Sequence, residues 1–507
     1  MIVVPDVGRA YGMITRLVLS RRARAGQGCP PQVWEGGRMR EIVIVGGGIA
    51  GAATAWFLHQ AGRTDLRVTI LEGSPRVGGK LATAELAGIP VDTGAEAMLS
   101  RRPEAVELAR AVGLGDALRH PATTSASVWT RGGLRPLPAG TVMGIPADQA
   151  AVAGGGILGP DSIARIGAEP HEPGPPLTGD VSIGKYVERR LGREIVDLLL
   201  EPLLGGVYAG HADELSLEAT VPQLLAQLRT DPSLVRAAAR AKAAAPTSDA
   251  PVFAGLDGGV GRLVPAVVRA SEADVRTDTT VRALTRTATG WELLTGPTRE
   301  PVTVRADAVV LACPARPASR LLESVAPGAA SELAGIEHAS MATIALAYPA
   351  SAVPADLPGS GFLVPPVEHR AIKAVTYSSR KWGWLAERAP ELVIVRASIG
   401  RHREEADLQR SDEELVAAAR ADLAAATGIA GEPVDTHVRR WGGALPQYAV
   451  GHRARVERIR AGVAAHPGLA VAGAAYDGLG IPACVASARS AATQVLAALP
   501  AAGTMTT

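Results

Sequence analysis

Residues 41–51 read Glu-Ile-Val-Ile-Val-Gly-Gly-Gly-Ile-Ala-Gly, a short β-branched run that opens directly into a glycine turn. Such a run is typical of a strand that is buried on both faces of a sheet. Gly46, Gly48 and Gly51 stand at G-x-G-x-x-G spacing. The first glycine allows a tight turn, the second lets the backbone approach a pyrophosphate, and the third allows a helix to pack closely on the strand. The stretch therefore predicts a dinucleotide-binding βαβ unit.

The residues after the turn complete this pattern. An alanine-rich helix is expected from Ala50 to Gln60, with its N-terminal amides directed at the phosphates. A second strand is predicted at residues 68–71, and Glu72 follows it about 20 residues after the glycines, where a carboxylate binds a ribose hydroxyl. A lone glycine turn can serve only to reverse the chain. Strand, helix and acid in this order instead favour an adenine dinucleotide without a 2′-phosphate.

Length and composition limit the class of protein. At 507 residues and 52.1 kDa the chain is longer than one hydrophobic core usually supports, so two domains are expected. Its 52 basic and 50 acidic residues nearly cancel and aromatic residues make up only 3%, which gives little support to nucleic-acid binding. No apolar stretch reaches about 18 residues, so we expect no transmembrane segment.

The cysteines and histidines predict neither a disulfide framework nor a metal site. The cysteines are Cys29, Cys313 and Cys484, which are far apart and form no C-x-x-C pair. The histidines lack H-x-x-H spacing. This usage fits a reducing compartment.

Two further segments extend the dinucleotide pattern. Residues 74–80 read Ser-Pro-Arg-Val-Gly-Gly-Lys, and they resemble the R-x-G-G signature that follows the dinucleotide motif in flavoproteins of the amine oxidase and protoporphyrinogen oxidase superfamily. Residues 469–473 form an apolar strand that leads into a glycine-rich turn and a helix from Ile481 to Leu499. This order resembles the closing flavin motif, in which a helix N-terminus faces the flavin. The resemblance implies FAD as cofactor.

Further motifs along the chain narrow the resemblance from the superfamily to one group of its enzymes. They lie at residues 92–96, 101–102, 137–146, 201–210, 445–448 and 473–487. Together they resemble the protoporphyrinogen and coproporphyrinogen III oxidases of haem biosynthesis, from about Arg40 to Leu499. The soluble, cytoplasmic form of Gram-positive bacteria, which acts on coproporphyrinogen III, fits the pattern best.

The resemblance implies an α/β fold of the flavin amine oxidase type, in which a Rossmann-like FAD-binding domain carries an inserted α+β substrate-binding domain. We expect the FAD-binding domain at residues 39–120, 250–318 and 438–500, and the substrate-binding region at residues 121–249 and 319–437. Residues 1–38 are expected to be a disordered or dispensable extension, and residues 501–507 a tail. Within the insertion, Ser182 is expected to cap a helix that ends before Gly205.

The resemblance also assigns cofactor contacts by position. They are Gly46, Gly47, Gly48, Ile49, Ala50, Gly51, Glu72, Gly73, Lys80, Gly94, Ala95, Glu96, Ala97, Val281, Trp441, Gly480, Ile481 and Pro482. Two of these residues have an equally simple structural interpretation. Lys80 can be an exposed charge after a turn, and Trp441 can be a core residue.

Substrate contacts follow from the chemistry of the implied substrate. Coproporphyrinogen carries four propionates, and arginine binds carboxylates through charge-assisted hydrogen bonds. Arg101 and Arg102 are therefore candidates, although a pair of arginines before a helix is equally often a solvated charge. Tyr208 lies in a motif expected near the macrocycle, but tyrosines at helix exits usually pack. No catalytic residue is identified.

The implied reaction is an FAD-dependent, oxygen-using oxidation of coproporphyrinogen III to coproporphyrin III. Hydride leaves an sp³ meso carbon for flavin N5 while pyrrole N–H protons are lost, and dioxygen is reduced to hydrogen peroxide. The flavin carries the redox step, so the protein chiefly orients the macrocycle and excludes competing chemistry. The partners are then the tetrapyrrole and dioxygen, and a transient contact with a ferrochelatase is an expectation of the pathway.

Three alternatives remain open. Protoporphyrinogen IX shares the ring and the reaction, so the side-chain preference is not fixed. Another flavin amine oxidase-type enzyme, such as a polyamine oxidase or a carotenoid desaturase, would share the terminal motifs but not the middle ones. A non-catalytic binding protein that keeps the dinucleotide fold, as in the GDP-dissociation inhibitors, would purify without yellow colour.

Overall fold

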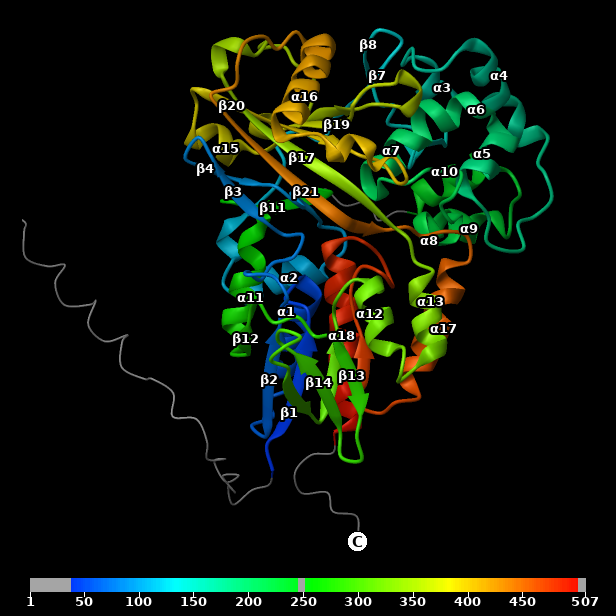
Figure 1. The fold of residues 1–507 in the computed structure, drawn as a ribbon. Helices are drawn as coiled ribbons and strands as arrows, with labels where there is room; N and C mark the ends of the chain where they lie inside the picture. The colour runs from blue at the N-terminus through cyan, green and yellow to red at the C-terminus, as the bar shows by residue number, and fades with distance from the viewer. Residues whose placement is uncertain (1–37, 245–250, 500–507) are drawn as a thin grey trace, which may run out of the picture. The chain divides into compact units, whose positions relative to one another are not determined.

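The structure is a computed structural model that describes residues 38–244 and 251–499. The predictions for an N-terminal extension and a C-terminal tail fall outside these residues, except for the boundary residue Arg38. Within them, the expected α/β fold with a parallel sheet is present (Figure 1). The fold is built on two sheets, one parallel and one mixed.

The parallel sheet is the dinucleotide-binding sheet predicted from the glycine turn. Its five strands stand in the order β12-β2-β1-β16-β22. They are β1 (Arg40–Val45), β2 (Leu66–Leu71), β12 (Asp274–Arg276), β16 (Ala308–Leu311) and β22 (Leu469–Val471). Every pairing is parallel. The carboxyl ends of β1, β2, β16 and β22 therefore lie at one edge, where this class of sheet binds its ligands.

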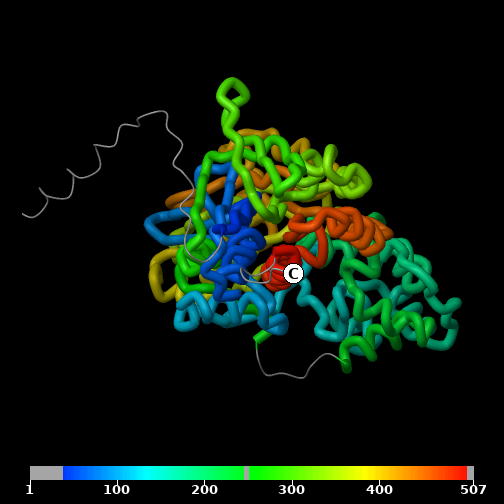
Figure 2. The backbone as a smooth tube through the Cα atoms, turned by 90° about the horizontal axis from the view of Figure 1, so that it is seen from below, coloured from blue at the N-terminus to red at the C-terminus, as the bar shows by residue number. Residues whose placement is uncertain are grey.

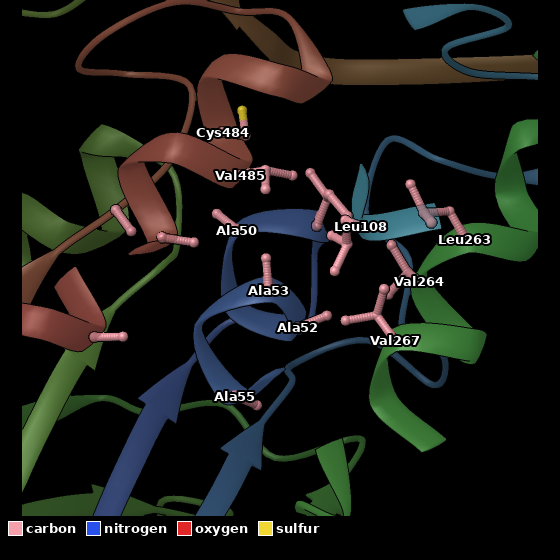
Figure 3. Close-up of a cluster of buried hydrophobic side chains, with 14 of the residues drawn as sticks. Ala50, Ala52, Ala53, Ala55, Leu108, Leu263, Val264, Val267, Cys484 and Val485 are labelled. Carbon is pink, nitrogen blue, oxygen red and sulfur yellow. The ribbon is translucent and has the colours of Figure 1, made fainter. Parts of the chain in front are cut away.

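Alternating side chains of this sheet enter two different cores. On one face α1 (Ile49–Gln60) packs with α2 (Glu104–Ala111), α11 (Leu263–Ser271) and α18 (Ile481–Ala498). Figure 3 shows the small alanines of α1 between Val264 and Val267 of α11 and Cys484 and Val485 of α18. The small alanines of α1 thus let α11 and α18 pack closely against it. The other face is covered by α12 (Ala315–Leu322), α13 (Pro327–Ala334) and α17 (His452–Ala464).

The second sheet has seven strands in the order β21-β17-β20-β19-β18-β7-β8. They are β7 (Ser127–Thr130), β8 (Gly133–Pro136), β17 (His338–Pro349), β18 (Gly361–Leu363), β19 (Ile372–Tyr377), β20 (Leu392–Ile399) and β21 (Asp435–Pro446). Helix α16 (Asp412–Thr427) contributes to the core on one face. The predicted domain boundary between residues 437 and 438 falls inside β21, which pairs with β17 along both halves of its length.

A helical region follows β8 and forms a core of its own. It contains α4 (Pro160–Ala168), α5 (Ile183–Leu191), α7 (Glu201–Tyr208), α9 (Pro222–Leu228) and α10 (Leu234–Ala243). Seen from below, these cyan-to-green helices lie on one side of the blue N-terminal segment and the red helix α18 (Figure 2). Among the described helices none is long and apolar enough to cross a membrane.

The helix predicted from Ser182 is correct at its start and wrong at its end. The Ser182 side chain accepts the Lys185 amide as an N-cap. The helix stops at Gly192, whose φ of 98° lies in the left-handed region. The chain then turns through short helical pieces into α7, which contains Gly205 and ends at Tyr208.

Candidate active site

A single cavity of about 800 Å³ joins the two sheets. One end is lined by the glycine turn after β1, by Glu72 at the end of β2 and by Thr280 and Val281. The other end is lined by Gly206 and Val207 of α7 and by β17, β19 and β20 of the mixed sheet. The cavity therefore extends from the predicted dinucleotide site to the mixed sheet.

The glycine turn has the backbone that a pyrophosphate site requires. Gly46 has a φ of 111°, and a Cβ there would lie 2.8 Å from the carbonyl oxygen of Ala312. A Cβ on Gly51 would lie 1.9 Å from the carbonyl oxygen of Gly46, so only glycine allows α1 to start here. A Cβ on Gly48 would meet no described atom within 4 Å, because Gly48 faces the cavity. Gly46 and Gly51 thus have the turn and packing geometry that their spacing predicts, and Gly48 leaves open space toward the cavity.

Glu72 connects the glycine turn to the end of β2. One carboxylate oxygen accepts the Gly47 amide at 2.6 Å, and the other accepts the Ser74 amide at 2.8 Å. Gly73, next in the chain, packs against Thr280, since a Cβ there would lie 3.0 Å from the Thr280 hydroxyl oxygen. The carboxylate is thus fixed at the cavity edge, where the ribose of a dinucleotide would lie.

The C-terminal motif brings a second helix N-terminus to the same cavity. Gly473 follows β22 with a φ of 124°, and its amide donates to the Ser487 hydroxyl at 3.0 Å. Helix α18 begins at Ile481 with Gly480 as its N-cap residue and Pro482 in the first turn. Gly480, Ile481 and Cys484 line the cavity. The 18-residue helix directs its free N-terminal amides at any negative charge bound there.

The segment that follows β4 (Ile89–Asp92) is tied to the mixed sheet. The indole N–H of Trp441 donates to the Thr93 carbonyl at 2.9 Å, and a Cβ on Gly94 would lie 3.1 Å from the Trp441 ring. Gly94, Ala95 and Ala97 line the cavity, as does Trp441. Small residues therefore let the indole form part of the wall.

Glu96 is placed differently from the prediction. It does not line the cavity, and its carboxylate accepts the Ser378 hydroxyl at 2.9 Å and the Lys381 ammonium at 3.2 Å. A guanidinium nitrogen of Arg396 lies 3.4 Å from the same carboxylate. Burial raises the pKa of Glu96, but Lys381 and Arg396 outweigh it and hold the pKa at about 2. Glu96 therefore binds cations in the protein.

Burial also sets the protonation of the other groups at the cavity. It lowers the pKa of Lys80, which is partly buried. It raises the pKa of Cys313 to about 12 and that of Cys484 to about 11. Burial and the nearby Lys80 lower the pKa of His338 to about 4. Near neutral pH the cavity thus holds two thiols and one neutral imidazole.

Most of the predicted cofactor residues are brought together by the fold. The cavity is lined by Gly46, Gly48, Ile49, Ala50, Glu72, Gly73, Lys80, Gly94, Ala95, Ala97, Val281, Trp441, Gly480 and Ile481. Gly47, Gly51 and Pro482 lie next to lining residues. Together they offer a glycine cradle, an acidic residue for ribose and a helix N-terminus, which fit an adenine dinucleotide with a flavin.

The three predicted substrate residues do not line this cavity. Arg101 is exposed, and Arg102 forms an ion pair with Glu104 at 2.8 Å. Tyr208 is buried, with its ring centroid 5.5 Å from that of Tyr448, although its neighbours Gly206 and Val207 do line the cavity. A substrate role for these three residues stays a prediction.

Sequence reasoning missed Arg396, His338 and Cys313 as lining residues. Arg396 lies in the middle of β20 and His338 at the start of β17. Neither belongs to a local motif, and their position depends on strand pairing across the mixed sheet. The described residues hold no group of three or more His, Cys, Asp or Glu side chains arranged for a metal ion.

Comparison with known proteins places this site in a class. Residues 49–496 match the family of flavin containing amine oxidoreductases, and the chain belongs to it. The cofactor is therefore a flavin, and the dinucleotide cradle identifies it as FAD.

Individual relatives show which enzymes of this family the chain resembles in sequence and in structure. A coproporphyrinogen III oxidase of Mycobacterium tuberculosis is 40% identical over 468 residues, which cover 91% of this chain and 98% of that protein. A coproporphyrinogen III oxidase of Bacillus subtilis is 32% identical over 90% of this chain and 98% of its own. A solved structure from Exiguobacterium sp. 255-15 superposes with a TM-score of 0.79 at 33% identity, covering 90% of this chain and 98% of the other. The chain belongs with the coproporphyrinogen III oxidases, which confirms the family expected from its motifs.

Proposed function

We propose that this protein is an FAD-dependent porphyrinogen oxidase that converts coproporphyrinogen III to coproporphyrin III with dioxygen as acceptor. The observation that carries the proposal is the continuous cavity between the dinucleotide cradle and the wall of the mixed sheet. Its similarity to coproporphyrinogen III oxidases over nine-tenths of the chain supports the substrate.

The reaction has a defined balance. In each of three cycles the substrate loses a hydride from a meso carbon and one proton, and this hydride and proton together reduce one dioxygen to hydrogen peroxide. Bound FAD supplies the hydride acceptor at N5. A role for the chain in haem biosynthesis, in the cytoplasm, with a transient contact to a ferrochelatase, is part of the proposal.

The protein residues hold and orient the reactants. The glycine turn and α18 hold the negative charge of the cofactor through backbone amides. The part of the cavity lined by the mixed sheet carries mostly small or apolar side chains, which suits a flat macrocycle. Lys80 and Arg396 are the only lysine and arginine that line the described cavity. The interior thus offers few charges, each of them in a fixed place.

Purified protein tests the proposal directly. Its flavin spectrum is recorded, and porphyrin fluorescence and peroxide are followed in air after addition of coproporphyrinogen III or protoporphyrinogen IX. Faster formation of coproporphyrin with peroxide release is expected. A preference for protoporphyrinogen would assign the enzyme to that substrate. A yellow protein that is inert towards both would overturn the porphyrinogen assignment and favour another amine oxidase-type reaction.

A further inference from the structure

The wall of the cavity formed by the mixed sheet contains one arginine, and several of the side chains beside it are small. Thr343, Ala374, Thr376 and Ser398 line this wall from β17, β19 and β20. Arg396 lies directly opposite Thr376 in the pairing of β19 with β20. Paired residues of adjacent strands project on the same face, so the guanidinium stands beside an open, nearly uncharged surface.

Arg396 is held in place but only partly satisfied. One of its terminal nitrogens, Nη2, donates to the Gly94 carbonyl at 2.8 Å, and its side chain is 12% exposed. Nη1 lies 3.4 Å from the Glu96 carboxylate. Neither Nε nor Nη1 has a hydrogen-bond partner among the described residues, although both are buried. A guanidinium has five N–H donors, so Nε and Nη1 leave donors without a partner in the protein.

Arg396 shares its nearest carboxylate with a second cation. The Glu96 carboxylate lies 3.4 Å from Arg396 and 3.2 Å from Lys381. The other nearby acid, Asp92, accepts the amides of Val260 and Gly261, and the charge of Arg396 favours its ionised form. What remains unmet at Arg396 is hydrogen bonding by Nε and Nη1, which an anionic acceptor would supply. A carboxylate is such an acceptor.

We propose that Arg396 binds one propionate of the tetrapyrrole and that Glu96 is its positioning residue. The inference rests on the proposed function, because the proposed tetrapyrrole substrate brings its propionate carboxylates to this cavity. Arg396 lies on the mixed sheet, whereas the cofactor phosphates belong at the glycine turn on the other sheet. A planar, bidentate donor also suits a carboxylate at the rim of a flat ring.

The test compares FAD-loaded wild type with Arg396→Met. Binding of coproporphyrin III, which is stable in air, is measured by fluorescence titration, and KM and kcat are measured with coproporphyrinogen III. Arg396→Met should weaken porphyrin binding and raise KM by about tenfold or more, with kcat changed much less. Arg396→Lys keeps the charge and should recover part of the affinity. Glu96 keeps Ser378 and Lys381 as partners in both variants, which favours correct folding.

Arg305→Met is the matched control, because Arg305 is 84% exposed, pairs only with Glu292 on its own small sheet, and lies outside the cavity. This control should bind porphyrin as wild type does. Unchanged porphyrin affinity in Arg396→Met would overturn the inference, as would a loss of FAD affinity with unchanged porphyrin binding. If Arg396→Met does not fold, Arg396→Gln and Arg396→Lys decide by the same titration. A wild-type enzyme that neither binds coproporphyrin nor oxidises coproporphyrinogen would instead overturn the proposed function.

Discussion

The carboxylate of Glu72 accepts the amide of Gly47 at 2.6 Å, so the end of β2 is bonded directly to the glycine turn after β1. This contact fixes the turn before the cofactor arrives. Glu72→Ala removes both the contact and the expected ribose acceptor, and we predict about tenfold weaker FAD binding. Titration of apoprotein with FAD, followed by flavin fluorescence, measures the change.

Two controls separate the effect of Glu72 from general damage. Glu72→Gln keeps an acceptor oxygen and should lose less affinity than Glu72→Ala. Glu85→Ala changes an exposed acid on the hairpin strand β3 (Thr83–Leu86) and should bind FAD as wild type does. Equal FAD affinity in wild type and Glu72→Ala would refute the role of the acid.

The two later glycines of the turn are predicted to respond differently to the same methyl group. Gly51→Ala would place its Cβ 1.9 Å from the Gly46 carbonyl, so the start of α1 must move away from β1. We expect a loss of stability of about 1–3 kcal/mol or more, seen as a lower midpoint of denaturant unfolding. Gly48→Ala meets no described atom within 4 Å and faces the cavity. It should fold normally and lose FAD affinity.

Gly133→Ala serves as the control for this pair. Gly133 lies on β8, outside the glycine turn that follows β1, and a Cβ there would have open space around it. If Gly48→Ala unfolded as easily as Gly51→Ala, the distinction between a packing glycine and a ligand-facing glycine would be wrong.

The difference between predicted and observed site residues has a physical origin. The glycine turn and Glu72 belong to one local βαβ unit, and its geometry follows from sequence spacing alone. Arg396 and His338 reach the cavity through the pairing of β20 and β21 with β17, which brings together residues far apart in the chain. A single sequence carries no local signal for such pairings.

The sequence alone also does not predict the direction in which these side chains point. Glu96 belongs to the segment that lines the cavity, yet it turns toward Lys381, a residue 285 positions away. Tyr208 ends a helix whose preceding residues line the cavity, yet its ring packs against Tyr448. Each residue belongs to a segment that lines the cavity, but its side chain packs against partners from distant elements.

The two cavity thiols are predicted to be unreactive in the folded protein. Burial raises the pKa of Cys313 to about 12 and that of Cys484 to about 11. At pH 8 the thiolate fraction of Cys484 is then roughly two orders of magnitude below that of a free cysteine. Iodoacetamide should label both residues far more slowly in native protein than in urea, as measured by peptide mass spectrometry. Rapid native labelling of Cys484 at pH 8 would contradict its protonated state.

Lys373 on β19 is buried without a hydrogen-bond partner for its ammonium among the described residues. Burial, with a smaller contribution from Arg401, lowers its pKa to about 7. The unfolded chain therefore binds more protons than the folded one between about pH 7 and the ordinary lysine value near 10.5. Over that window the stability of the wild type should rise with pH.

Lys373→Met removes the buried amine and keeps the length of the side chain. We predict that it stabilises the protein at pH 7 by about 1–3 kcal/mol in denaturant unfolding, and that the gain shrinks as pH rises toward 10. Lys381→Met is the matched comparison, because the Lys381 ammonium pairs with Glu96 at 3.2 Å. The same substitution there leaves a buried carboxylate with fewer partners and should destabilise. A Lys373→Met variant less stable than wild type at pH 7 would show that the buried amine has a partner when the protein is folded.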